Sequence, residues 1–593
     1  MTDRKISSNR LLMAMAFAGM FQYACQTQKP SPGTTQTPPA NTASTSTPAV
    51  PAAPATGNTE AWVYEGVEFN MPRVKETSFP DYTVSITDFG AVGDGITKNT
   101  QAITKAIDAV VAAGGGKVLI PSGIWLTGPI ILKSNINIHT EEGALVIFST
   151  DREEYPVIET SFEGLDTYRC LSPIYGKDLE NIAFTGKGVF DGSGHAWRAV
   201  NKSQLTEREW QKKVRSGGLV MEDRGPTWVP TENFKKGKLM SKTNVPELPA
   251  KEDYEAIKDF LRPVMVSLIG CKKVLLDGPT FQNSPAWNIH PLMCEDVIIR
   301  NLTVKNPEYA HNGDGIDLES CRSVLIYNNR FDVGDDAICF KSGKDIDGRR
   351  RGMPTENVVV KNNVVYHGHG GFVIGSEMSG GVRNVHVSNC TFIGTDVGLR
   401  FKSTRGRGGV VENIWISNIN MINIPTEAIR FNMFYGGTPP RLDEGAAVAE
   451  RTEEAVPVTE ETPSFRNIYM KNITATGTET AAFFQGLPEM NLQNVSLENA
   501  VLEARNGITL IDADGIKLKN VKVLAEKGAA LTIYNSRNVE VSGLAYHQNQ
   551  DSTSVVRVLG ELTQNVQLQR SNFKNAARQV QQAKNLQQGV SWQ

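Results

Sequence analysis

Short runs of alternating β-branched and other apolar residues, each opened by a turn residue, recur along the second half of the chain. Most neighbouring runs start roughly 23 to 34 residues apart, a period typical of solenoid repeats. The clearest runs start at Asp296, Ser323, Asn357, Asn384, Asn413, Asn467, Gly515, Asn538 and Asn565. Strands this short, without intervening helices, predict an all-β, right-handed parallel β-helix in which each rung adds strands to long parallel sheets.

A β-propeller is the structural alternative, but it needs antiparallel strands and hairpin signals that these repeats lack. Upstream of the repeats, residues 99–113 carry apolar side chains at helical spacing and end in Gly114-Gly115-Gly116. We predict a short N-terminal capping helix there, which would cover the open edge of the solenoid. Two stretches, about residues 200–258 and 436–463, break the rhythm. Insertions into solenoids project as loops, often on the binding face.

Residues 1–25 resemble an export signal. A charged start precedes the apolar run Leu11–Phe21, which is too short to span a membrane as a stable helix. Ala24-Cys25 resembles the cleavage point of a bacterial lipoprotein and predicts lipidation of Cys25. Gln22 and Tyr23 are unusual in that position, so simple secretion is the alternative. We therefore expect an exported protein, periplasmic or on the outer membrane, that contacts the membrane only through this anchor.

Residues 26–58 are rich in Pro, Thr, Ser and Ala and contain almost no large apolar side chains. Such a segment cannot bury enough surface to fold, so we predict a disordered linker. This leaves residues 59–593 as a single β-helix domain. A net charge of −3 over 593 residues gives no indication of nucleic-acid binding, which is typical of strongly basic domains.

The cysteines that follow the candidate anchor are scattered and form no CxxC pair, so a zinc site is not indicated. They are Cys170, Cys271, Cys294, Cys321, Cys339 and Cys390. Buried thiols inside the coil are the favoured interpretation, although export permits disulfides.

Five strand segments share the pattern small, apolar, any, apolar, and begin at Gly315, Ala337, Gly371, Gly398 and Ala428. The residues directly before them are Asp314, Asp336, Gly370, Val397 and Glu427, and the residues before those are Gly313, Asp335, His369, Asp396 and Thr426. Adjacent parallel strands lie about 4.8 Å apart. Stacking therefore predicts a cluster of Asp314, Asp335 and Asp336, in which repulsion raises the pKa of one carboxyl.

Taken singly, each of these acidic motifs could be a turn or a solvated corner. Their recurrence in the same columns favours a catalytic site, because glycoside hydrolysis needs both a protonated carboxyl and a carboxylate. In inverting enzymes the two groups lie about 6.5–9.5 Å apart, a separation that we expect carboxylates on successive rungs to reach.

Three further side chains are expected beside the acids. His369 follows Asp335 in its column between glycines, and we expect it to keep the acid in its working protonation state. Arg400 and Lys402 point the same way from one strand, since side chains alternate with period two. A guanidinium matches a carboxylate bidentately, so the pair predicts an anionic sugar. A solvated basic strand edge is the alternative.

Weaker candidates for sugar contacts lie upstream. Ala286-Trp287-Asn288-Ile289 fits the strand pattern and would place Asn288 in the column of Asp317 and Arg400, with His290 two residues further on. Ordinary ladder or turn roles are the alternative for both. Asn312, which opens the first acidic motif, is a further candidate.

These motifs together resemble family 28 of the glycoside hydrolases, the polygalacturonases. The resemblance rests on Asn312-Gly-Asp314-Gly-Ile-Asp317, Gly334-Asp335-Asp336, Gly368-His369-Gly370 and Arg400-Phe-Lys402, in that order. The segment that starts at Asp88 resembles the first turn of pectin-active β-helices. Asn283 to His290 and the run from Gly375 resemble the bacterial exo-acting branch. Gly313 stands where many members have Thr, and we expect little consequence.

The resemblance implies an inverting hydrolase of pectin that needs no metal or other cofactor. Asp335 would be the general acid, Asp314 and Asp336 would activate water, and His369 would assist. Arg400 and Lys402 would hold a galacturonate carboxylate. The insertion at about 200–258 would close one end of the cleft and make the enzyme exo-acting.

Three other functions remain open. One is a galacturonosidase acting on branched, rhamnogalacturonan-type pectin. Another is a calcium-dependent pectate lyase, against which the histidine and the Arg-x-Lys pair argue. The last is a β-helical carbohydrate-binding protein without activity, which would need exposed aromatic residues more than clustered acids.

Overall fold

The computed structural model describes residues 60–592, apart from 438–441, 443–453, 548–553, 572–578, 584–585 and 587–589. The predicted export signal, Cys25 and the 26–58 linker lie outside the described residues, as does much of the 436–463 insertion. Residues 57–593 form one compact unit. In the described part, no helix is both long and apolar enough to cross a membrane.

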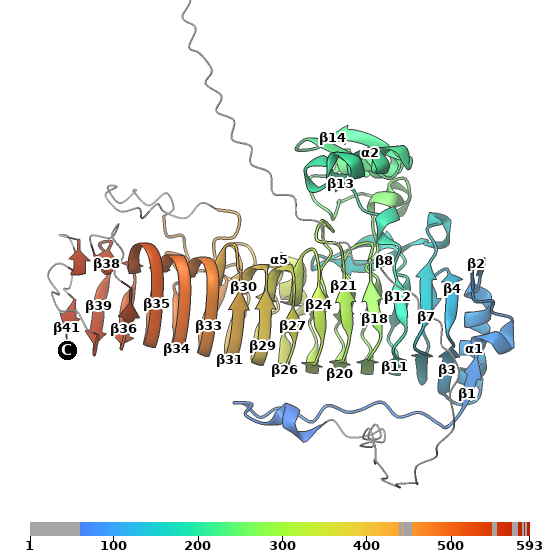
Figure 1. The fold of residues 1–593 in the computed structure, drawn as a ribbon, viewed down its shortest axis with the longest axis horizontal. Coiled ribbons are helices and arrows are strands. Elements are labelled where there is room, and N and C mark those ends of the chain that lie inside the picture. Colours follow the sequence, from blue (N-terminus) through green and yellow to red (C-terminus); the bar gives the residue numbers. More distant parts are fainter. Residues whose placement is uncertain are drawn as a thin grey trace, which may run out of the picture. The chain divides into compact units, whose positions relative to one another are not determined.

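The strands of the coil pair in parallel with their equivalents one rung further along the chain, which confirms the predicted parallel β-helix (Figure 1). The ladder that carries the acids contains β10 (Ile174–Lys177), β16 (Val266–Ile269), β19 (Ile289–Leu292), β22 (Ile316–Glu319), β25 (Asp336–Lys341), β28 (Gly368–Ile374), β30 (Thr395–Lys402) and β32 (Glu427–Asn432).

Two further ladders complete the rungs. The second contains β11 (Glu180–Gly186), β17 (Lys272–Asp277), β20 (Glu295–Arg300), β23 (Arg322–Tyr327), β26 (Thr355–Lys361), β29 (Val382–Ile393) and β31 (Val410–Ile422). The third contains β12 (Val189–Asp191), β18 (Thr280–Gln282), β21 (Thr303–Lys305), β24 (Arg330–Asp332) and β27 (Val364–Val365). Later rungs run through β33 (Ser464–Gln485), β34 (Leu492–Ile511) and β35 (Ala513–Tyr534).

The core fills the inside of the coil, because alternate side chains of every strand point inward. Ile316 and Leu318 of β22 are fully buried and stack on Ile338 and Phe340 of β25. Burying each such side chain contributes about 1.5–3 kcal/mol. The six cysteines expected as buried thiols are buried and free, as predicted.

A helix covers the first rung. In α1 (Thr100–Ala112), Ile103, Ala106 and Ile107 are buried and join the core of the coil. The chain then turns at Gly116, where φ is +143° and an added Cβ would lie 2.3 Å from the Tyr82 carbonyl oxygen. The predicted capping helix is therefore present with nearly the predicted bounds.

The insertion at about 200–258 is more ordered than the predicted loop. An antiparallel sheet of β13 (Val200–Asn201), β15 (Pro226–Val229) and β14 (Leu219–Glu222) lies near α2 (Glu207–Arg215) in Figure 1. It continues into α3 (Glu232–Met240) and α4 (Lys251–Glu255). Phe234, Tyr254, Ile257 and Phe260 form a small core of their own, which explains why this stretch folds.

Stacked asparagines hold the turns of successive rungs in register. Asn418, Asn472, Asn499 and Asn520 each donate a side-chain hydrogen bond to the asparagine one rung earlier, at 2.9–3.4 Å. All four have positive φ, between 52° and 56°, which asparagine tolerates better than most residues. The asparagine-rich turns seen in the sequence are thus structural ladders.

Asn472→Ala should lower the free energy of unfolding, since it donates to Asn418, accepts from Asn499 and has φ of 56°. The left-handed conformation costs alanine about 1–2 kcal/mol, and each lost hydrogen bond about 1 kcal/mol. Asn472→Gly keeps the backbone conformation accessible and should lose less. Urea denaturation compares the three proteins; an alanine variant as stable as the wild type would contradict the ladder's role.

Candidate active site

The register of the acid-bearing ladder determines which side chains meet. Ile316 pairs with Ile338, Asp336 with Gly370, and Gly370 with Val397. This is the predicted alignment of the five strand segments, which is therefore confirmed. It places Asp314 beside Asp336, and Asp335 beside His369, on adjacent rungs.

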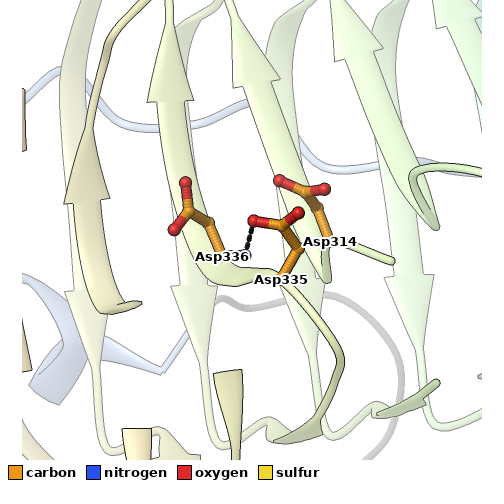
Figure 2. A group of neighbouring side chains, drawn as sticks. All are labelled: Asp314, Asp335 and Asp336. Carbon is orange, nitrogen blue, oxygen red and sulfur yellow. Dashed lines mark hydrogen bonds between the residues drawn. The ribbon is translucent and has the colours of Figure 1, made fainter. Parts of the chain in front are cut away.

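Asp314, Asp335 and Asp336 form a tight cluster where β22 and β25 begin (Figure 2). One carboxylate oxygen from each lies within 4.8 Å of the others, and the Asp336 amide donates to Asp335 Oδ1 at 3.1 Å. Their nearest oxygens therefore lie closer together than the 6.5–9.5 Å between the carboxyl groups of inverting enzymes. In-register strands hold equivalent residues only one strand spacing apart, and Asp335 lies at the bend directly before β25.

Asp314 is the carboxyl of the cluster best suited to hold a proton. It is 3% exposed, and its Oδ1 has no hydrogen-bond partner among the residues that the structure describes. Burial raises its pKa well above the ordinary value, and the negative charges of Asp317 and Asp335 raise it further.

Asp336 is held ionised by two cations. Arg400 Nη1 lies 3.2 Å from Asp336 Oδ1, and Lys402 Nζ lies 2.7 Å from Asp336 Oδ2. Burial opposes ionisation, but Lys402 and Arg400 outweigh it and depress the pKa of Asp336. Arg400 and Lys402 point the same way, as expected, and in this structure they contact Asp336. The ring of Tyr435, which the sequence did not single out, lies 5.9 Å from the Arg400 guanidinium carbon and 5.5 Å from Lys402 Nζ.

His369 pairs with Asp335. Its Nδ1 lies 3.0 Å from Asp335 Oδ1, and its Nε2 lies 3.8 Å from Asp396. The hydrogen bond to Asp335 raises the pKa of His369, against the effect of partial burial. Burial raises the pKa of Asp335, but the bond from His369 outweighs it and the pKa is lowered. In the free protein, therefore, Asp335 and His369 form an ion pair.

The predicted position of Asn288 is wrong. Ile289 pairs with Ile316, so His290, and not Asn288, lies in the column of Asp317 and Arg400. The small-apolar pattern misled the alignment because Trp287 packs outside the coil against Phe162, while Ile289 takes the inward position. Asn288 is fully buried and donates to the Phe281 carbonyl at 3.3 Å.

His290 and Asn312 are both engaged by other protein groups. His290 is 1% exposed and its Nε2 lies 2.9 Å from Glu319. Asn312 Oδ1 accepts hydrogen bonds from Arg262 at 2.9 Å and from Asn244 at 3.2 Å. These contacts tie the motif that carries Asp314 to the insertion.

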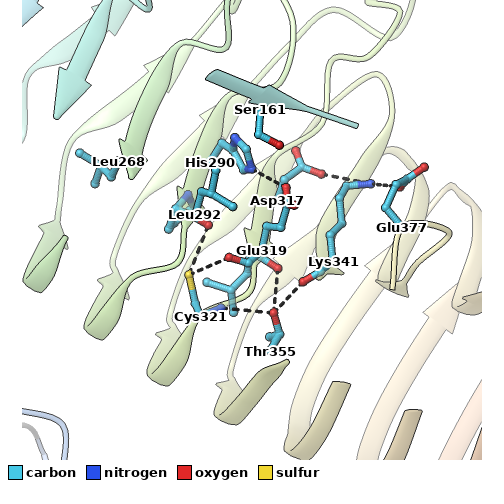
Figure 3. A network of polar contacts seen from close by, with 12 residues as sticks. Ser161, Leu268, His290, Leu292, Asp317, Glu319, Cys321, Lys341, Thr355 and Glu377 are labelled. Carbon is cyan, nitrogen blue, oxygen red and sulfur yellow. Dashed lines mark hydrogen bonds and ion pairs between the residues drawn. The ribbon is translucent and has the colours of Figure 1, made fainter. Parts of the chain in front are cut away.

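A buried polar network next to the acids was not foreseen from the sequence (Figure 3). Lys341 Nζ lies 2.9 Å from Glu377 and 3.6 Å from Asp317, and Glu319 bridges His290 and Arg351. Within the described part of the chain the carboxylate oxygens of Asp317 have no hydrogen-bond partner, and burial raises the pKa of Asp317. Lys341 lies one rung after Asp317 and Glu319 in the same ladder. The repeat spacing could therefore have predicted that Lys341 belongs to this network. Arg351 comes from the separate helix α5 (Asp345–Arg351), which no ladder pattern places.

The three clustered carboxylates are close enough together to hold one cation. Calcium, however, takes six to eight oxygen ligands, and here Asp336 already pairs with Arg400 and Lys402, and Asp335 with His369. The donor set therefore fits a hard cation poorly. It fits acid–base chemistry on an anionic sugar, because it combines a proton-bearing carboxyl, ionised carboxylates and adjacent cations.

Comparison with known proteins agrees with this chemistry. The profile described as Glycosyl hydrolases family 28 matches residues 256–503, and the one described as Rhamnogalacturonase A/epimerase, pectate lyase-like matches residues 83–145. A hyperthermoactive exopolygalacturonase from Thermotoga maritima is 34% identical, with a TM-score of 0.59 over 76% of this chain and 93% of that one.

Two further relatives extend the comparison. The exo-poly-alpha-D-galacturonosidase of Dickeya chrysanthemi is 30% identical over 61% of this chain and 58% of its own length. A probable polygalacturonase of Vitis vinifera is 27% identical over 73% of this chain and 78% of its own.

The fold and the site define a carbohydrate-active hydrolase built on a parallel β-helix. With the relatives above, the chain belongs to glycoside hydrolase family 28 and is a polygalacturonase-like enzyme.

Because its pKa is raised, His369 should keep its proton above its ordinary pKa of about 6.5. The ion pair with Asp335 is fully formed below that pH and is lost as pH rises through the raised pKa. Asp335→Asn should lower the pKa of His369. Histidine-labelled NMR over a pH titration measures this, with His369→Gln to assign the signal and His367, which pairs with Asp332, as internal control. An unchanged titration in Asp335→Asn would contradict the pairing.

Proposed function

We propose that the protein hydrolyses α-1,4-galacturonosyl linkages of pectin from the chain end and releases galacturonic acid. The observation that carries the proposal is the cluster of Asp314, Asp335 and Asp336 beside two cations, the partly buried Arg400 and the buried Lys402. Cations at this position favour a uronate over a neutral sugar, because a guanidinium and an ammonium pair with its carboxylate.

In the proposed reaction, Asp335 protonates the leaving oxygen and water attacks the anomeric carbon under general-base catalysis by Asp314 and Asp336. The close carboxylates share one proton. In the free protein the raised pKa of Asp314 favours this carboxyl as its holder, and one oxygen of Asp314 lies within 4.8 Å of an oxygen of Asp335. Transfer of this proton to Asp335 accompanies binding and leaves Asp314 as a base.

The substrate itself makes Asp336 more basic. A sugar carboxylate that draws Arg400 and Lys402 away from Asp336 removes the two charges that depress the pKa of Asp336. Asp336 then becomes a useful base only when an anionic sugar is bound. This coupling makes charge on the substrate a requirement for rate as well as for binding.

We propose inversion at the anomeric carbon, as the family resemblance implies, although oxygens within 4.8 Å are nearer to the separation of about 5–5.5 Å found in retaining enzymes. A retaining enzyme needs a carboxylate that attacks the sugar itself. In the proposed reaction Asp314 and Asp336 activate a water molecule instead, which gives inversion.

Exo action is supported by the insertion and by the relatives. Asn244 of the insertion bonds to Asn312, two residues before Asp314, so the insertion borders the acid cluster and is suited to close the cleft. The Thermotoga and Dickeya relatives are both named as exo-acting. Hydrolysis within branched, rhamnogalacturonan-type pectin is the second candidate.

We also propose export and anchoring through a lipid on Cys25. The sequence signals at Leu11–Phe21 and Ala24-Cys25 support this proposal. Metabolic labelling with a palmitate analogue, compared with Cys25→Ala, tests it.

The proposed reaction is tested with polygalacturonic acid in the presence of EDTA, with products followed by chromatography. We expect galacturonic acid from the earliest time and no unsaturated product, because hydrolysis here needs no cation. Asp335→Asn should lose about 10²–10⁴-fold in rate, the usual contribution of general acid–base catalysis.

The other possible results would each change the proposed function. Oligomers of graded length at early times would overturn exo action. Activity that EDTA abolishes, and that gives an ultraviolet-absorbing product without EDTA, would indicate a lyase. Release of galacturonate only from branched pectin would move the assignment to the second candidate.

A further inference from the structure

A cavity of about 680 Å³ lies between the insertion and the coil, next to the acid cluster. The insertion contributes Phe234, Lys238 and Lys242 to its wall, and the coil contributes Arg262 and His311. His311 directly precedes Asn312, so the cavity lies close to Asp314. Nothing in the reaction described above uses its charged side chains.

Positive charge predominates in the wall of this cavity. Its lining includes four cationic side chains, Arg224, Lys238, Lys242 and Arg262, against two acids, Asp223 and Glu163. Lys238 pairs with Asp223 at 3.1 Å, whereas Glu163 accepts a hydrogen bond from Asn244. No carboxylate within the described ranges forms an ion pair with Arg224, Lys242 or Arg262.

Two further buried arginines, Arg169 and Arg198, lie close to Arg262 without lining the cavity. Arg169, Arg198 and Arg262 are 2%, 1% and 5% exposed. Arg262 donates to the carbonyls of Pro285 and His311 at 2.9 Å, and Arg169 donates to the Arg262 carbonyl at 2.9 and 2.6 Å. Arg198 donates to the Ser284 carbonyl and to Asn283 Oδ1.

These guanidinium groups have carbonyl and amide partners but, in the part of the chain that the structure describes, no carboxylate salt bridge. Burial, together with the charges of Arg169 and Arg198, lowers the pKa of Arg262 to about 9. Burying several cations without counter-charges is unfavourable, and a bound anion offsets that cost. The arginines therefore give the cavity a positive potential, which favours an anionic ligand over a neutral one.

We propose that this cavity is a second anion-binding subsite, which takes the carboxylate of the terminal uronate of the substrate through Lys242 and Lys238. Arg262, which lines the cavity, contributes a fixed positive charge to it. The proposal rests on the proposed function, since it supplies a further sugar of the same polyanionic substrate.

This subsite lies on the other side of the acids from Arg400 and Lys402. His311 and Arg262 come from the segments that lead into β22 and β16, whereas Arg400 and Lys402 lie on β30. Between β16 and β30 this ladder contains β19, β22, β25 and β28, at about 4.8 Å per rung. A substrate that spans the scissile bond would thus meet cations on both sides, and the terminal sugar would have to be charged.

The test combines one substitution with one change to the substrate. Lys242→Met should reduce kcat/KM for trigalacturonate about 10-fold or more, as expected for loss of a charged hydrogen bond. It should have little effect on trigalacturonate methyl-esterified at the sugar that enters the cavity, because no charge remains to lose. Esterification of each terminal sugar in turn identifies that sugar. Lys236→Met, an exposed lysine of α3 that does not line the cavity, is the matched control.

A Lys242→Met effect of equal size on both esters and on trigalacturonate, or no effect at all, would overturn the proposal. Binding to the Asp335→Asn protein separates this outcome from failure of the proposed function. Digalacturonate that binds more tightly than its dimethyl ester, with the difference reduced in Lys242→Met but not in Lys236→Met, would support the subsite even if no galacturonide is hydrolysed. Equal binding of acid and ester would overturn it.

Discussion

The in-register stacking of parallel strands is the constraint on which the site depends. A rung spacing of about 4.8 Å repeats every side chain next to its equivalent, so like residues are forced together. In the core this stacks Ile316 on Ile338, and at the turns it builds asparagine ladders. Where β22 and β25 begin, the same stacking brings one carboxylate oxygen each of Asp314, Asp335 and Asp336 within 4.8 Å of one another. The fold thereby produces the electrostatic repulsion that keeps one carboxyl protonated.

The surrounding residues give each of the three carboxylates a different electrostatic environment rather than neutralising all three alike. Asp336 is paired with Arg400 and Lys402, Asp335 with His369, and Asp314 with no cation. Each carboxylate therefore has a different proton affinity, although all three lie in one cluster. Acid–base catalysis depends on such differences. A uronate substrate would redistribute the cations, so binding and activation of the base are linked.

The features that depend only on the strand ladder could be predicted from the sequence. The parallel β-helix, the capping helix and the register of the five acid-bearing strands followed from periodicity. Asn288 was misplaced because Ala286 and Trp287 imitate the inward pattern that begins at Ile289. The stacking predicted that the three acids cluster, but not which of their oxygens approach one another, because strand spacing does not determine side-chain rotamers. The partners of Glu319 and Asn312, namely Arg351 and Arg262, come from elements outside the ladder, so no repeat pattern predicts them.

The central claim is that Asp335 delivers the proton of this cluster to the leaving oxygen. Replacing the sugar leaving group by an activated phenol, which needs no proton, tests it directly. Asp335→Asn should lose about 10²–10⁴-fold on oligogalacturonide and recover most of that loss on the aryl galacturonide. Asp314→Asn should be impaired on both substrates, because it lacks a base. Selective recovery in Asp314→Asn, with Asp335→Asn inactive on both, would contradict the account and make Asp314 the acid.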